Sequence, residues 1–140
     1  MYWNNQYTTY EIGSVVSGST LTDSYTGNTN TSDVRGYKMV TVYIEYTPGV
    51  DTSDAYIQFE AGPDLSLLFP KTALLDVNTS GESTTRSHIF KLEAITAGVA
   101  VKRRLLIDTA DIKLRISAKE ITSGAYGTIK VLLTRHEQFN

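Results

Sequence analysis

The sequence contains no cysteine, which excludes disulfide bridges and thiolate metal sites. A chain without cysteine fits assembly in a reducing cytoplasm. No apolar run approaches the roughly 18 residues that a helix needs to cross a bilayer. The first residues, Met1 to Asn5, lack the basic and apolar segments of a signal peptide. From these absences we expect no membrane segment and a protein that is made and assembled in a reducing cytoplasm.

The chain also lacks an excess of charge of either sign. Its net charge of −2 over 140 residues gives no general attraction to nucleic acid, so we expect no nucleic-acid partner. Charge is unevenly distributed, because all 13 Lys and Arg residues lie at Arg35 or later. The length fits a single domain with a substantial apolar core.

Residues 1–32 form a polar, tyrosine-rich leader with few apolar side chains. Such a segment cannot build its own core, so it is either a flexible arm with a long loop or an arm that orders against a neighbouring molecule. Tyrosine and tryptophan are enriched at interfaces because they combine apolar area with a polar tip. The expected partner-binding residues are therefore Trp3, Tyr7, Tyr10 and Tyr25. One strand is expected within the leader, at residues 11–16.

Residues 33–140 are expected to form the β domain, because apolar and polar residues alternate along them as in half-buried strands. The clearest strands are expected at residues 37–46, 55–61, 84–94, 103–107, 111–119 and 128–135. Between 65 and 77, Pro70 predicts either two short strands or a bent edge strand. Residues 92–101 are compatible with a short helix.

About eight short strands separated by turn residues indicate an all-β, antiparallel sandwich. Eight strands without a long helix favour a jelly roll, and an immunoglobulin-like sandwich is the alternative.

Motifs that carry chemistry are missing, so we expect neither an enzyme nor a bound cofactor or metal. There is no Gly-x-Ser-x-Gly elbow and no phosphate-binding glycine loop. His88 is expected as a partly buried sheet residue and His136 as a solvated one. Two turns each carry a pair of carboxylates, Asp51 with Asp54 and Asp108 with Asp111. These aspartates either form the turns or supply part of a calcium shell.

Lys102-Arg103-Arg104 is the only basic run. Lys102 and Arg104 are expected on one face of a strand and Arg103 on the other. These side chains either form a modest basic patch together with Lys113, Arg115 and Lys119 or are ordinary solvated residues.

The order of features resembles small jelly-roll virion proteins of tailed bacteriophages. The resemblance covers roughly residues 33–135 and is carried by "VRGYKMVTVYIEYTPG", "AYIQFEAGPD", "KRRLLID", "IKLRISAKE" and "GTIKVLLTRH". It implies a structural role in the virion, most specifically as a capsid decoration or cement protein. Such a protein binds and stabilises the shell of major capsid protein as a trimer or dimer.

Two alternatives remain open at this stage. One is a phage neck, tail or receptor-binding component. The other is a carbohydrate-binding β-sandwich with a groove lined by exposed aromatics, for which Tyr43, Tyr56 and Tyr126 are the candidates.

Overall fold

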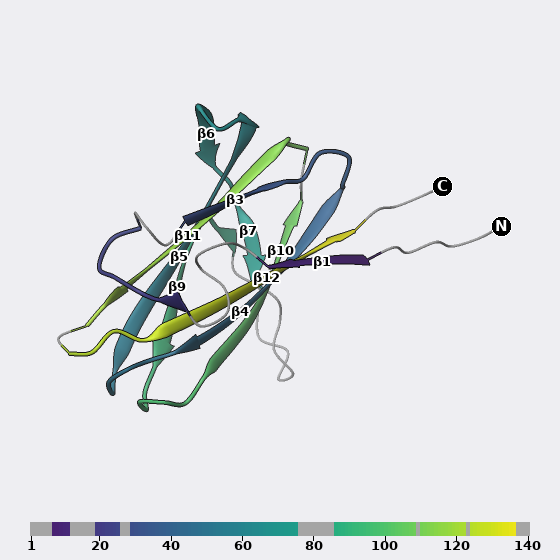
Figure 1. Cartoon of the computed structure of the whole chain (residues 1–140). Helices are drawn as coiled ribbons and strands as arrows, with labels where there is room; N and C mark the ends of the chain where they lie inside the picture. Colours follow the sequence, from purple (N-terminus) through teal and green to yellow (C-terminus); the bar gives the residue numbers. More distant parts are fainter. Residues whose placement is uncertain are drawn as a thin grey trace.

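The structure is a computed structural model of the chain and describes residues 7–11, 19–25, 29–75, 86–108, 110–122 and 124–136. These residues form an all-β sandwich of two antiparallel sheets (Figure 1). Within these ranges, no helix is long and apolar enough to span a bilayer.

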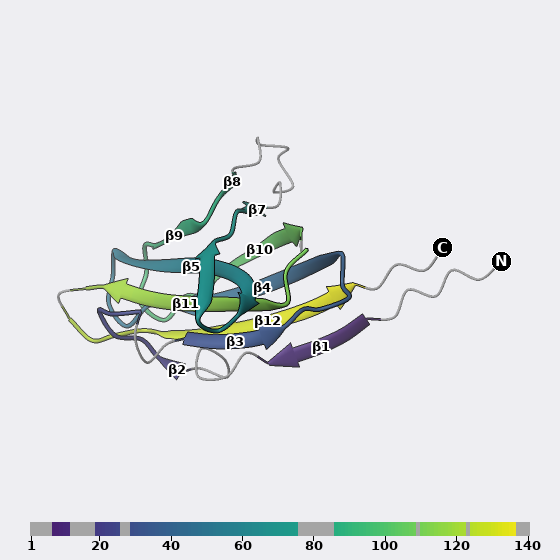
Figure 2. The ribbon, with the colours of Figure 1, turned by 90° about the horizontal axis from the view of Figure 1, so that it is seen from above.

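One sheet has seven strands and the other has five (Figure 2). The seven-stranded sheet comprises β1 (Tyr7–Glu11), β2 (Ser19–Thr20), β4 (Met39–Thr47), β7 (Ala73–Leu75), β8 (Arg86–Ser87), β10 (Val101–Asp108) and β12 (Thr128–His136). The five-stranded sheet comprises β3 (Thr29–Asp33), β5 (Ser53–Asp64), β6 (Leu67–Pro70), β9 (Ile89–Ala94) and β11 (Lys113–Ile121).

Eight of these strands have the connections of a jelly roll, as the sequence predicted. They form the rows β2-β12-β4-β10 and β3-β11-β5-β9, with β1 beside β2 along the same edge of β12. Successive strands of this set lie in opposite sheets, except for β5 and β9, which pair directly. This is the double-sheet arrangement of a jelly roll. The short strands β6, β7 and β8 are inserted between β5 and β9.

Period-two alternation places one face of each long strand in the core. The apolar residues that alternate along β4, β5, β11 and β12 are buried, including Val42, Ile57, Phe59, Ile116 and Val131. Phe59 packs edge-to-face against Phe90 from the neighbouring strand, with ring centres 6.2 Å apart. The outer faces of β4 and β12 expose Tyr43 and Lys130, whereas the opposed pair Thr41 and Thr134 on the same faces is buried.

The described part of the leader belongs to the sandwich. The boundary predicted between residues 32 and 33 falls inside β3, and β1 and β2 pair with β12. Leu21 is fully buried, and its backbone N–H donates to the Gly127 carbonyl at 3.0 Å. Of the strand predicted at 11–16, Glu11 ends β1, and residues 12–16 lie outside the described part of the chain.

The two ambiguous regions have definite structures. In the first region, the described residues 65–75 contain two short strands, β6 and β7, and Pro70 ends the first of them. The helix considered for residues 92–101 does not form. Instead, β9 runs to Ala94 and a turn leads into β10. Gly98 in this turn has φ of +77°, a left-handed conformation that a helix interior does not contain.

Candidate functional site

A hollow of the outer surface lies over the central strands of the larger sheet. Its floor is β4, and β10 and β12 form its two sides. The hollow has a volume of about 410 Å³ and is lined by Tyr43, Ile44, Glu45, Lys102, Arg103, Arg104, Lys130 and Leu132. We call this hollow the basic groove.

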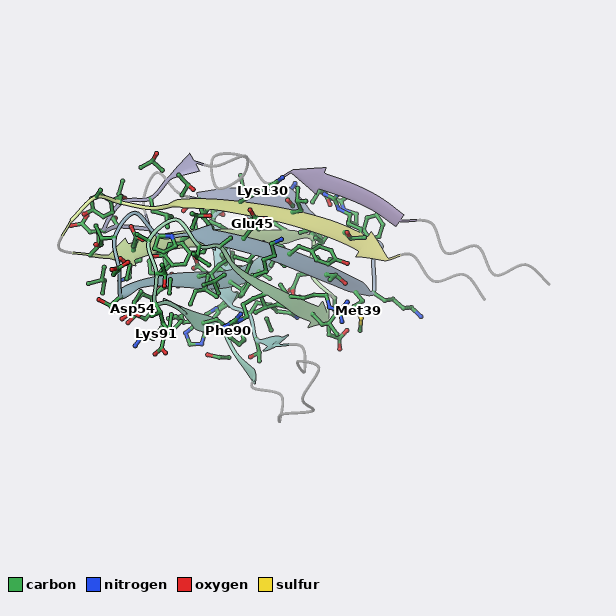
Figure 3. The ribbon with its side chains drawn as sticks, turned by 90° about the horizontal axis from the view of Figure 1, so that it is seen from below. Met39, Glu45, Asp54, Phe90, Lys91 and Lys130 are labelled. Atoms are coloured by element: carbon green, nitrogen blue, oxygen red, sulfur yellow. The ribbon has the colours of Figure 1, made fainter. Side chains whose placement is uncertain are left out.

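Strand register explains why these side chains meet. Glu45 lies directly opposite Lys102 of β10 and directly opposite Lys130 of β12. One pair further along, Tyr43 lies opposite Arg104 and Leu132 in the same way. Directly opposed residues of antiparallel strands project to the same face. Figure 3 shows Glu45 and Lys130 on neighbouring strands.

The basic groove is positive although the chain is not. Three cationic side chains, Lys102, Arg104 and Lys130, project to this face beside one carboxylate, Glu45, in a chain whose net charge is −2. Arg103 lies opposite the buried Ile44 and projects to the other face of β10, as the sequence predicted. Lys102, Arg104 and Lys130 are exposed, and Tyr43 exposes 41% of its surface. Charged side chains along the open edge of a sheet also discourage pairing with a strand of another molecule. The alternative to ligand binding is therefore that these cations protect the edge of β10 from such pairing.

The basic patch considered in the sequence is not a single surface. Lys113, Arg115 and Lys119 lie on β11, in the sheet opposite β10. The Arg115 guanidinium binds the Glu60 carboxylate at 2.7 Å, and Lys113 pairs with Asp33 at 3.4 Å. These cations therefore neutralise carboxylates on the smaller sheet. Lys130, which the sequence pattern did not single out, completes the basic groove instead.

The predicted partner-binding aromatics are not gathered at the basic groove. Trp3 lies outside the described residues, and Tyr7 and Tyr10 lie in β1, where the structure describes the backbone alone. Tyr25 is half-buried against the smaller sheet, with the Lys119 ammonium 4.8 Å from its ring centre. Burial, together with the neighbouring Tyr56, raises the pKa of the Tyr25 phenol.

The three tyrosines considered for a sugar groove lie in separate places. Tyr43 projects from the larger sheet and Tyr56 from the outer face of the smaller one. Tyr126 lies in the connection between β11 and β12. The Lys119 ammonium also lies 5.8 Å from the ring centre of Tyr56. Tyr43 and Tyr56 therefore do not form one aromatic platform.

Three of the four aspartates considered as calcium ligands are engaged in structural contacts. Asp51 accepts a hydrogen bond from the Ala97 backbone N–H at 2.7 Å. Asp54 pairs with Lys91 at 3.5 Å (Figure 3), and Asp111 pairs with Lys71 at 3.2 Å. In the described part of the chain, no three His, Asp or Glu side chains gather as metal ligands.

The two histidines lie at the ends of strands. His88 occupies a bend between β8 and β9 and is half-buried, and its carbonyl accepts the Phe59 N–H at 2.9 Å. His136 is the last residue of β12.

A second candidate surface is apolar and was not singled out by the sequence pattern. The hairpin of β5 and β6, at the upper end of the molecule in Figure 1, exposes Leu65, Leu67 and Phe69 by 61%, 49% and 56%. Clustered exposed side chains of this size mark protein–protein contact sites more often than scattered ones do. We call these three residues the apolar hairpin.

The fold and its two surfaces define a jelly-roll sandwich with a basic groove on one sheet and an apolar hairpin at one end. YomS, a protein derived from the SPBc2 prophage, is similar in structure, with a TM-score of 0.58 and 10% identity over 98% of each chain. XepA, an exported protein of PBSX, also has a TM-score of 0.58 and 10% identity. The match covers 95% of this chain and 38% of XepA.

A third structure is more distant. The tripod from the baseplate of bacteriophage Tuc2009 has a TM-score of 0.43 at 10% identity, over 95% of this chain and 64% of that one, and carries no argument at that score. No family model matches the sequence, and no curated protein matches it. At such identities the likeness to YomS and XepA shows a shared fold alone.

Proposed function

We propose that the protein is a structural component of a bacteriophage virion that binds other virion proteins and catalyses no reaction. The observation that carries the proposal is the jelly-roll fold shared with YomS along nearly the whole of both chains. The basic groove and the apolar hairpin support it, since both are surfaces suited to contact with a protein.

Within this class, we propose capsid decoration as the specific role, with the major capsid protein as partner. The sequence resemblance to cement proteins supports this role. A place in the neck, tail or receptor-binding apparatus is the alternative within the same class. In either case the protein acts as a homo-oligomer, for which the apolar hairpin supplies an exposed contact surface.

Two experiments test these statements separately. Quantitative mass spectrometry of purified virions should find the chain at a copy number that matches the capsid lattice. A copy number of a few per particle would instead assign the protein to the neck or tail. Complete absence from the virion would overturn the virion role.

The second experiment measures binding to assembled shells that lack the chain. The purified protein should bind these shells and raise the temperature at which they break apart. Failure to sediment with intact shells would rule out decoration, whereas the virion role would still be judged by mass spectrometry.

A further inference from the structure

The basic groove has features that are not needed to protect the edge of β10 from pairing with another strand. Lys130 and Leu132 come from β12, two strands away from the open side of β10. Tyr43 and Leu132 add apolar area to the lining. A combination of cations and apolar surface favours a ligand that carries both negative charge and apolar side chains.

We propose that the basic groove binds an extended, acidic segment of a partner protein. Charge complementarity identifies the occupant, because three cations project to the groove face beside one carboxylate. The apolar lining then distinguishes a peptide with leucine-like side chains from a bare phosphate chain. The inference rests on the proposed function only in taking the partner to be a virion protein.

Strand geometry gives the spacing of the acidic residues. Lys102 and Lys130 flank Glu45 on the two neighbouring strands. Adjacent strands lie about 4.8 Å apart, so the two lysine positions lie about 10 Å apart across β4. A chain in the polyproline II conformation has three residues per turn and advances about 3.1 Å per residue, so carboxylates three residues apart lie on one side and reach both lysines. An apolar residue between them lies against the Tyr43 and Leu132 side of the groove.

The test uses a peptide of about twelve residues with Glu at every third position and Leu and Thr between. Its affinity for the full-length protein is measured by fluorescence anisotropy at low and moderate salt. The comparison probes are the same peptide with Gln for Glu, a peptide of equal composition with its Glu residues clustered at one end, and an oligothymidylate of equal charge. We expect the spaced acidic peptide to bind most tightly and to weaken as salt rises.

Variants assign the binding to the groove. Lys130→Glu and Lys102→Glu should each weaken binding by about fivefold or more, while Glu45→Gln should strengthen it by about threefold. The gain expected from Glu45→Gln cannot arise from misfolding. Lys38→Glu, at an exposed position outside the groove, is the matched charge control and should change affinity by less than about twofold.

The outcomes are distinct from those of the virion experiments. Equal effects of Lys130→Glu and Lys38→Glu, or no gain with Glu45→Gln, would overturn the groove as the binding site. Tighter binding of oligothymidylate than of the peptide would overturn the acidic segment in favour of a nucleic acid. A protein that binds the peptide at the groove but is absent from virions would retain this inference and lose the proposed function.

Discussion

The most consequential buried polar contact among the described residues joins Tyr46 of β4 to Glu120 of β11. Both residues are fully buried, and the Tyr46 hydroxyl donates to the Glu120 carboxylate. The second carboxylate oxygen accepts the Gly127 N–H at 2.7 Å. Gly127 can approach because it has no side chain, since a Cβ there would lie 2.3 Å from the Thr47 carbonyl oxygen. This contact ties the two sheets to the turn before β12.

Tyr46→Phe tests the strength of this contact. The change leaves one oxygen of the buried Glu120 carboxylate without the phenol that donates to it, which costs about 1–3 kcal/mol of unfolding free energy. Urea denaturation of the variant beside wild type measures the loss. Tyr43→Phe, at an exposed tyrosine on the same strand, is the control and should leave stability nearly unchanged. Equal stabilities for wild type and Tyr46→Phe would show that the contact contributes nothing.

The same phenol makes stability sensitive to alkaline pH. Burial, followed by the contact with Glu120, raises the pKa of Tyr46 well above its ordinary value. The folded state therefore keeps this proton at a pH where the unfolded chain loses it. The resulting contribution is complete below about pH 10 and is lost as pH rises beyond that value. Urea titrations between about pH 8 and pH 11 should show the stability advantage of wild type over Tyr46→Phe narrowing with pH. A constant difference across this range would contradict the prediction.

At the scale of elements, hydrophobic alternation predicted the strands that have one buried face and missed those that lack large apolar residues. β4, β5, β11 and β12 were all predicted, with boundaries within a few residues. β3 was not, because Thr29–Asp33 contains no apolar residue. It is held by backbone pairing with β11 and by the Thr29 hydroxyl, which donates to Ser117 at 2.8 Å. An edge strand of this kind leaves no periodic signal in the sequence.

Leu21→Ala tests whether the leader is part of the fold. Leu21 is fully buried in the core, so its truncation should cost about 2–5 kcal/mol. Thermal and urea unfolding measure the loss. Asp23→Ala, two residues away and exposed, should cost less than about 0.5 kcal/mol. If both variants were as stable as wild type, the leader would be a dispensable arm.

At the scale of the whole molecule, the sequence predicted the jelly roll but not the site. Eight strands with alternating faces restrict the fold to a few sandwiches, among which the jelly roll was favoured over an immunoglobulin-like sandwich. The basic groove depends on register between strands far apart in sequence, with Glu45 beside both Lys102 and Lys130. Such register is fixed by tertiary pairing, so the basic run at 102–104 could be seen and its partner Lys130 could not.

The apolar hairpin yields the prediction for the assembled state. Leu67 and Phe69 are about half exposed, so Leu67→Ser with Phe69→Ser should remove contact area while costing little folding stability. We expect wild type to associate as concentration rises and the double variant to remain a monomer, as measured by light scattering after size-exclusion chromatography. Ile95→Ser removes an apolar side chain that is 80% exposed near the opposite end of β5 and serves as the control. Association of the double variant equal to that of wild type would assign the contact to another surface. If wild type stays monomeric at all concentrations, the proposal of a homo-oligomer is contradicted. The apolar hairpin would then contact a different virion protein.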